Sequence, residues 1–381
     1  MLLTESQREW LRVRKYLRQC RNDLGRSVAQ EYPDLPKVAG TVLLTRPEWL
    51  PSVPIPLDAI DLLFAPDVPF TGLTGTDPLA ASVSPERPDG SRYPSYSAAM
   101  ADLAAPAVFE DRSTYRLLDV DLAGPRGRLV FGRGSYFDGA DIGEAVAHEY
   151  AVARRTDSRT PLRAAIGDPC DLARRPTNIG VAALTVRYDR AGGEATFLLH
   201  WRDPAKVGHA GGLYMVVPVG IFQASGDDPE HERNDFSLWH CLVREYAEEL
   251  LGEPEDHGSG QIDYDSWPFA ARMTDALRSG LISVHVLGMG VDPLTFATDL
   301  LTVVVFDAPL FDELFVRMVD TNAEGRFVGS TLDGTGHKGV PGTADQAQRM
   351  VRHQSMQAAG AAALALAQRN GFLSRPDPDR R

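Results

Sequence analysis

Three glutamates recur along one short stretch of the chain at the spacing of a single helix face. Glu245, Glu248 and Glu249 occupy positions i, i+3 and i+4, so in a helix their carboxylates lie on one side. Like charges at this spacing destabilise a bare helix, so solvent, nearby arginines or a bound cation must offset them. Mg²⁺, or Mn²⁺ in its place, suits such a face, because a few carboxylates hold the ion while water and substrate phosphate oxygens complete its coordination. The pattern therefore predicts a metal site with Glu245, Glu248 and Glu249 as ligands.

A second interpretation of the same stretch needs no metal. The helix would bury its apolar side, and the three acids would then form an ordinary solvated face. The apolar side would consist of Leu238, Cys241, Leu242, Tyr246 and Leu250. Nothing in the pattern excludes this interpretation.

The residues around these acids, Arg244 to Glu249, read R-E-Y-A-E-E and resemble the core of the Nudix box, R-E-U-x-E-E. The resemblance implies that Glu248 and Glu249 are the principal metal ligands. It implies that Glu245 either binds the metal or acts on water, and that Arg244 orients the glutamates. Glu245, Glu249 and Arg244 are therefore the catalytic candidates.

The full Nudix box, G-x5-E-x7-R-E-U-x-E-E-x-G-U, is not complete in this chain. Phe236 stands at the position of the upstream glutamate, and Glu230 stands where the box begins with glycine. Asp235 and Glu232 lie nearby, but either could substitute for the missing acid only if the loop were shifted. At the other end of the box, Gly252 lies one residue further from Glu249 than the pattern requires.

The elements expected around the box also follow the Nudix order over about 140 residues. The resemblance implies an α/β/α sandwich with a mixed sheet. An antiparallel pair of strands should begin the domain, and an apolar strand interrupted by Pro218 and Gly220 should precede the polar loop and the glutamate-rich helix. The expected strands are residues 179–188, 194–201, 213–222, 282–287 and 300–306, and the expected helices are residues 235–251 and 309–319.

The rest of the chain predicts an α/β fold class with four regions. An amphipathic helix should occupy residues 1–30, and a loop-rich α/β region should follow over residues 31–155, with strands at 115–121 and 128–132 and a helix at 140–153. We place the Nudix-like domain at 175–320 and a single C-terminal helix at 340–372, alanine-rich between residues 344 and 370.

Composition and charge limit the partners of the chain. The formal net charge is −13, which repels polyanions and disfavours nucleic acid as a partner. Three widely spaced cysteines argue against a disulfide framework, and no apolar run is long enough to span a membrane, so we expect a cytoplasmic protein. The expected partner is a small phosphorylated molecule, and a homodimer is compatible with the sequence. The basic face of the first helix could bind a partner or dock on the acidic surface of the protein itself.

A loop between the predicted strands supplies the candidates for substrate binding. Arg202 and Lys206 lie between His200 and His209. In a Nudix fold this loop borders the substrate, so Arg202 or Lys206 could bind phosphate.

Three functions are compatible with these features. The first is a Mg²⁺- or Mn²⁺-dependent hydrolase of a nucleoside diphosphate-linked or related phosphoanhydride substrate. The second is a non-catalytic, Nudix-like regulatory protein that senses a nucleotide or metabolite through an incomplete box. The third is a scaffold that has lost both metal and ligand. Thermal stability measured with ligand and metal would distinguish them. A hydrolase should be stabilised and release product, a sensor should be stabilised without product, and a scaffold should show no response.

Overall fold

The computed structural model describes residues 3–106, 109–202, 212–254, 260–319, 321, 325–328 and 339–374. Its largest sheet has seven strands in the order β1-β10-β11-β5-β6-β13, with β9 also paired to β5. β11 and β5 run parallel, and the other neighbours run antiparallel. The strands are β1 (Ile55–Pro56), β5 (Ile179–Asp189), β6 (Glu194–Phe197), β9 (Val219–Ile221), β10 (Ile282–Val291), β11 (Thr298–Asp307) and β13 (Val340–Pro341).

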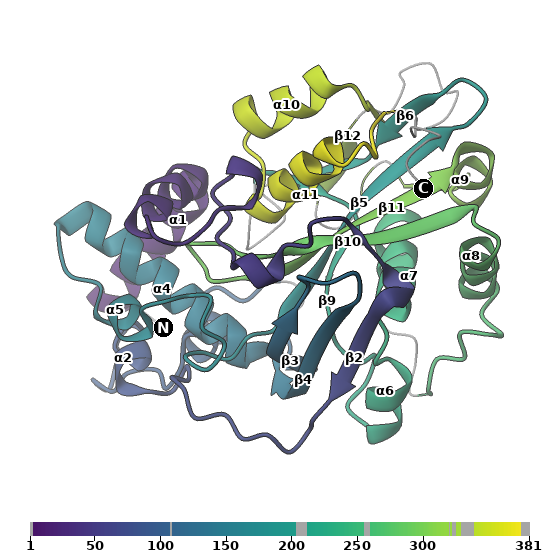
Figure 1. Ribbon diagram of the computed structural model, residues 1–381. Coiled ribbons are helices and arrows are strands. Elements are labelled where there is room, and N and C mark those ends of the chain that lie inside the picture. The colour runs from purple at the N-terminus through teal and green to yellow at the C-terminus, as the bar shows by residue number, and fades with distance from the viewer. Residues whose placement is uncertain are drawn as a thin grey trace.

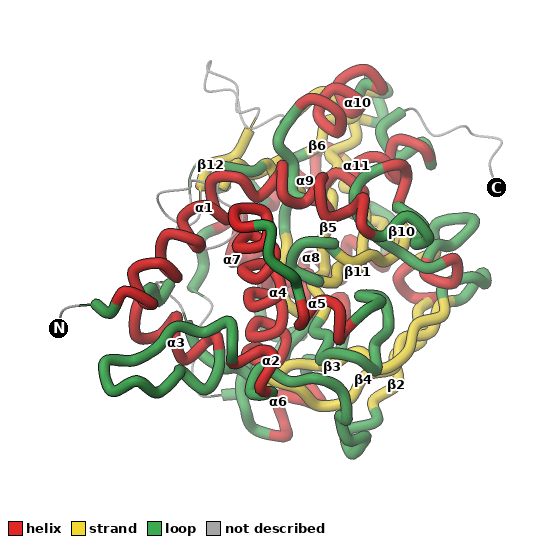
Figure 2. Tube along the Cα trace, turned by 90° about the vertical axis from the view of Figure 1, so that its left-hand side faces the viewer, coloured by secondary structure: helices red, strands yellow, loops and turns green. Residues whose placement is uncertain are grey.

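Helices cover both faces of this sheet (Figures 1 and 2). Side chains alternate along a strand, so Ile179 and Val181 of β5 enter one apolar core while Ala182 and Leu184 enter another. The first core includes α7 and α8, and the second includes α11. These layers confirm the predicted α/β class with a mixed sheet. The covering helices are α7 (Leu238–Leu251), α8 (Pro268–Arg278), α9 (Ala308–Leu314), α10 (Ala344–His353) and α11 (Ala358–Arg369).

Two smaller sheets and further helices complete the described chain. One sheet has the order β2-β4-β3 and the other β12-β7-β8. Their strands are β2 (Ile60–Phe64), β3 (Ser113–Asp121), β4 (Gly127–Ser135), β7 (Leu199–Arg202), β8 (Tyr214–Val216) and β12 (Gly325–Val328). The remaining helices are α1 (Glu5–Val28), α2 (Pro78–Ala81), α3 (Tyr96–Leu103), α4 (Tyr136–Thr156), α5 (Pro161–Ile166) and α6 (Pro229–Asn234), besides short 3-10 turns.

The first half of the chain is bonded directly to the large sheet. β1 forms the edge of the sheet beside β10, and Leu44 exchanges backbone hydrogen bonds of 2.9 and 2.8 Å with Val291. The buried guanidinium of Arg163 donates to the carbonyl oxygen of Leu294, in the turn between β10 and β11, at 3.0 Å. One apolar core extends without interruption from Trp10 of α1 to Met318 beyond α9.

The predicted C-terminal helix at residues 340–372 is wrong in one respect, because two helices occupy the region. α10 ends at His353, and α11 begins at Ala358. Between them the backbone of Gln357 donates to the carbonyl oxygen of Tyr214, and the backbone of Tyr214 donates to that of Ser355, so this short connection pairs with β8 instead of continuing the helix.

Other local predictions also differ from the structure. The strand expected at 213–222 is divided into β8 in the small sheet and β9 in the large sheet, and the helix expected at 309–319 ends at Leu314. The strand expected at 194–201 is divided into β6 and β7, and the backbone of Leu198 between them donates to Thr185 of β5 at 3.0 Å. The helix expected at 140–153 begins earlier, at Tyr136, because Ser135 and Asp138 form a capping box.

Part of the basic face of α1 pairs with acids of the protein itself. Arg8 pairs with Glu5 at 2.7 Å, and the buried Arg14 pairs with Glu144 of α4 at 3.0 Å. The structure thus favours docking on the protein's own acids for these two arginines. Over the described ranges, no helix is both long and apolar enough to cross a membrane.

A buried carboxylate lies at the start of β11. Asp299 is 5% exposed, and its cross-strand neighbours are Gly180 and Gly290, neither of which has a side chain. Its Oδ2 atom has no hydrogen-bond partner among the described residues. Burial, and then the charge of Asp292, raises the pKa of Asp299 to about 7. Below about pH 7 the folded protein therefore favours the protonated acid.

Asp299→Asn should remove a dependence of stability on pH. Because the folded pKa lies above the unfolded value of 3.8, the folded state binds the extra proton between about pH 4 and 7, and stability falls as pH rises through that window. Each pKa unit corresponds to about 1.4 kcal/mol. Between about pH 4 and 7 the free energy of unfolding of the wild type should therefore fall by a few kcal/mol relative to that of the variant, and above about pH 7 the difference should stay constant. Urea unfolding at several pH values measures this. A constant difference between the two proteins from pH 4 to 8 would contradict the prediction.

Candidate functional site

The glutamates lie on α7, and capping residues define both ends of this helix. The Ser237 hydroxyl accepts a hydrogen bond from the backbone of His240 at 3.3 Å, and Gly252 ends the helix in the left-handed conformation, φ 71°. The side expected to be apolar is buried at every position predicted: Leu238, Cys241, Leu242, Tyr246 and Leu250. This packing fixes which face of α7 carries the acids.

Arg244 does not lie on the acid face but in a buried polar network at the side of α7. Its guanidinium donates to the hydroxyl of Tyr264 at 2.6 Å and to the carbonyl oxygen of Gln223 at 2.7 Å. It also lies 3.4 Å from Oδ1 of Asp235. With only 5% of its surface exposed, Arg244 is placed to hold α7 and not to contact a ligand.

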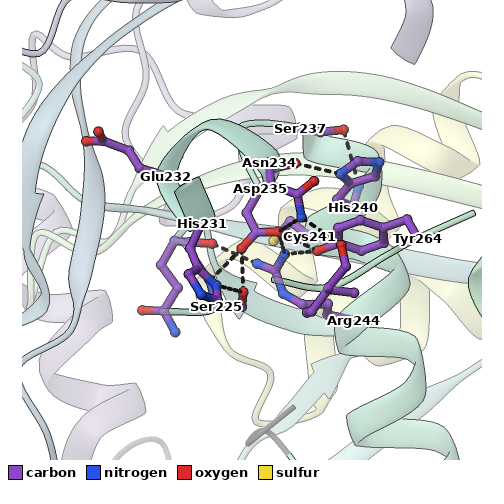
Figure 3. A network of polar contacts seen from close by, with 12 residues as sticks. Ser225, His231, Glu232, Asn234, Asp235, Ser237, His240, Cys241, Arg244 and Tyr264 are labelled. Carbon is purple, nitrogen blue, oxygen red and sulfur yellow. Dashed lines mark hydrogen bonds and ion pairs between the residues drawn. The ribbon is translucent and has the colours of Figure 1, made fainter. Parts of the chain in front are cut away.

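Asp235 lies at the centre of this network (Figure 3). It is completely buried, and its Oδ2 accepts from both the backbone and the hydroxyl of Ser225, at 2.7 and 2.6 Å. Oδ1 accepts from Tyr264 at 2.7 Å. Burial opposes ionisation, but Arg244 and the hydrogen bonds from Ser225 outweigh it, so the pKa of Asp235 lies below its ordinary value. Asp235 is therefore the anionic partner of Arg244.

The neighbours of Asp235 have other roles. Phe236, at the upstream acid position of the box, packs against Phe64, Tyr115, Phe131 and Phe222 in an aromatic cluster. Glu232 points away from the network and pairs with Arg133 of β4 at 2.8 Å (Figure 3). Neither Asp235 nor Glu232 therefore substitutes for the missing upstream glutamate, because Asp235 pairs with Arg244 and Glu232 pairs with Arg133.

Two of the three predicted acids are held against the backbone of β9. Oε1 of Glu249 accepts a hydrogen bond from the backbone of Val219 at 2.7 Å. The Glu245 carboxylate lies over Gly220 so closely that a Cβ there would stand 1.7 Å from its Oε1. Glu245, Glu248 and Glu249 are all partly buried, and each makes contacts within the protein. The geometry of Glu245 and Glu249 therefore differs from that of a freely solvated helix face.

This acid pair fits a hard divalent cation in its chemistry. Carboxylate oxygens suit Mg²⁺, which one or two carboxylates commonly hold while water and substrate phosphates supply the other ligands. Gly220 leaves the Glu245 carboxylate a space that any side chain would fill. Over the part of the chain that the structure describes, no group of three or more His, Cys, Asp or Glu side chains is arranged to hold a metal. The fit to a cation thus depends on the carboxylate chemistry and on the space at Gly220, and not on an assembled group of three ligands.

The predicted phosphate-binding residues are only partly described. Arg202 ends β7 and is partly buried, with one guanidinium nitrogen 3.4 Å from the sulfur of Met215 in β8. Lys206 and His209 lie outside the described residues. The buried His200 precedes them on β7 and packs against Phe327 of β12. The structure thus places Arg202 on the small sheet beside β8.

Comparison of the sequence with protein families and with curated proteins found no match. The resemblance to the Nudix superfamily therefore rests on the R-E-Y-A-E-E motif and on the order of the surrounding elements.

Sequence reasoning missed the residues that support the acids from outside the motif. Tyr264 lies beyond α7 and carries no local signal of its role. Ser225 precedes α6 in what reads as a polar loop. Gly220 did carry a signal, because a glycine within an apolar strand often marks a close approach of another group.

Proposed function

We propose that the protein is a metal-dependent hydrolase of a phosphoanhydride, with a nucleoside diphosphate linked to another group as its substrate class. The observation that supports this most directly is the position of Glu245 and Glu249, both held against the backbone of β9, with Gly220 providing the space. A helix face that served only solubility would not require a glycine opposite it.

In this proposal Glu245, Glu248 and Glu249 supply oxygen ligands for Mg²⁺ or Mn²⁺. When bound, the ion would neutralise the diphosphate and lower the pKa of an attacking water. Glu249 is held in place by the backbone N–H of Val219, which donates to its Oε1 at 2.7 Å. Glu245 is the candidate to accept a proton from water, and Arg244 holds the helix that carries both acids.

The substrate class follows from charge. A carboxylate face repels a bare diphosphate, so a cation must lie between them, and a net charge of −13 disfavours long polyanions as substrates. A small phosphorylated molecule meets both conditions. Arg202 and Lys206 are the candidates to bind the phosphate.

Glu249→Gln tests the proposal, because it removes the charge but keeps the size of the side chain. We expect turnover of the substrate found in a nucleoside diphosphate panel with Mg²⁺ or Mn²⁺ to fall on the order of 100-fold or more. Glu253→Gln is the matched control, since Glu253 follows Gly252 beyond the helix end. Unchanged turnover in Glu249→Gln, with the circular dichroism of the wild type, would exclude this mechanism.

A second function, sensing of a nucleotide or metabolite without cleavage, has one specific observation in its favour. The upstream acid of the box is replaced by Phe236, and the nearby Asp235 is committed to Arg244. The site thus has fewer acids for catalysis than a complete box. A rise in thermal stability with ligand and metal, without product in the same samples, would favour the sensor.

A further inference from the structure

Tyr264 contacts both members of the buried pair formed by Asp235 and Arg244. Its hydroxyl donates to Oδ1 of Asp235 at 2.7 Å and accepts from Arg244 at 2.6 Å. Its ring lies flat on the imidazole of His240, with centroids 3.7 Å apart and planes 16° apart (Figure 3). Only 8% of Tyr264 is exposed.

These contacts restrain α7 in two independent ways. The ring of Tyr264 stacks on His240 in the first turn of the helix, while its hydroxyl bonds to Arg244 one turn later. The same Arg244 guanidinium also donates to Gln223, which follows β9. Any rotation or sliding of α7 would therefore break at least one of these contacts.

The acid pair depends on the position that these contacts fix. Glu245 directly follows Arg244, and its carboxylate lies directly over Gly220. Burial is the main reason that the pKa of Tyr264 lies above its usual value, so the hydroxyl keeps its proton and continues to donate to Asp235. The link is thus permanent near neutral pH.

We propose that Tyr264 is a positioning residue for the metal-binding acids of α7. It acts through Arg244 and His240 and does not touch the ion. This inference rests on the proposed function, because it requires that Glu245 and Glu249 bind a divalent cation. Replacing a residue that orients metal ligands without touching the metal typically lowers metal affinity about 10–100-fold.

The test is the affinity for Mn²⁺ alone, measured by electron paramagnetic resonance of the free ion on the full-length protein. We compare the wild type with Tyr264→Phe, Tyr115→Phe and Glu245→Gln. Phenylalanine at 264 keeps the ring on His240 and removes only the hydroxyl. Tyr115 is the matched control, because it is as deeply buried and its hydroxyl donates to the Glu232 carbonyl oxygen at 2.7 Å.

We expect Tyr264→Phe to weaken Mn²⁺ binding about 10-fold or more, and Tyr115→Phe to leave it within about twofold. Equal affinity in the wild type and Tyr264→Phe would overturn the positioning role and leave the proposed function intact. If the wild type bound Mn²⁺ no better than Glu245→Gln, the proposed function would fail, and the inference with it. An equal loss in both tyrosine variants would also overturn the inference, because any buried hydroxyl would then have the same effect.

Discussion

Replacing Asp235 with asparagine should lower the free energy of unfolding by about 3–5 kcal/mol, because the buried Arg244 guanidinium loses its counter-charge. Asp235 is 0% exposed, and its carboxylate accepts from Ser225 and Tyr264 as well as facing Arg244. Asparagine has nearly the same size, so the loss reports the missing charge and not a cavity. Urea unfolding of the full chain at pH 7 measures it.

The pH dependence of this loss has a definite sign. An acid with a depressed pKa stabilises the fold above its unfolded pKa, here 3.8, and that contribution disappears as pH falls through the folded pKa. The difference between wild type and Asp235→Asn should therefore be constant near neutral pH and shrink in acid. Asp61→Asn is the control, because its pairing with Arg126 is exposed and should contribute little. A difference that widened in acid would contradict the prediction.

Gly220→Ala should abolish the acid site while leaving the fold in place. A Cβ at this position would lie 1.7 Å from Oε1 and 1.8 Å from Cδ of Glu245, so the carboxylate must move. That carboxylate is the flexible end of a side chain, so its displacement costs the fold little. A shift of about 1 Å in a catalytic group can reduce turnover on the order of 100-fold. We therefore expect turnover and Mn²⁺ binding to fall to the level of Glu245→Gln.

The control for this experiment is Gly260→Ala. No atom lies within 4 Å of a Cβ placed at Gly260, so this variant should retain wild-type turnover and Mn²⁺ affinity. Thermal unfolding of both variants separates loss of the site from loss of the fold. Wild-type Mn²⁺ affinity in Gly220→Ala would show that Glu245 is not a ligand.

Elements with strong local patterns could be predicted from the sequence. The apolar run over residues 179–188 has buried side chains on both faces for most of its length, as a central strand requires, and it forms β5. The capping box at Thr4 and Gln7 is present at the start of α1. In contrast, α8 begins at Pro268 after a segment of mixed polarity, and the sequence analysis did not predict it.

The errors arose where tertiary contacts override local pattern. An alanine-rich sequence favours one helix over residues 344–370, yet backbone bonds to Tyr214 hold the chain extended between α10 and α11. The apolar run at 194–201 reads as one strand, but it leaves the large sheet at Leu198 and joins β8. Tyr214 is distant in sequence from α10 and α11, and no residue in the run at 194–201 marks the point where it changes sheets, so no local pattern reveals either feature.

For the candidate site, too, the local pattern was predictable and the long-range contacts were not. Helical spacing alone places Glu245 and Glu249 together, and their packing against β9 is a long-range contact that spacing cannot give. The identity of the acid that pairs with Arg244 depends on the exact path of the loop containing α6. Tyr264 reaches Arg244 from 20 positions further along the chain, and nothing in its own neighbourhood indicates that contact.

The bonding of the first half of the chain to the large sheet determines how the protein can be divided. A fragment limited to residues 175–320 would lose β1 from the side of β10 and α11 from one face of the sheet, exposing an unpaired strand edge and apolar side chains such as Ala182 and Leu184. Such a fragment should aggregate, and limited proteolysis should release no stable core of that size. The R-E-Y-A-E-E motif is therefore not a portable module: a transfer of the proposed activity to another scaffold would have to carry nearly the entire chain.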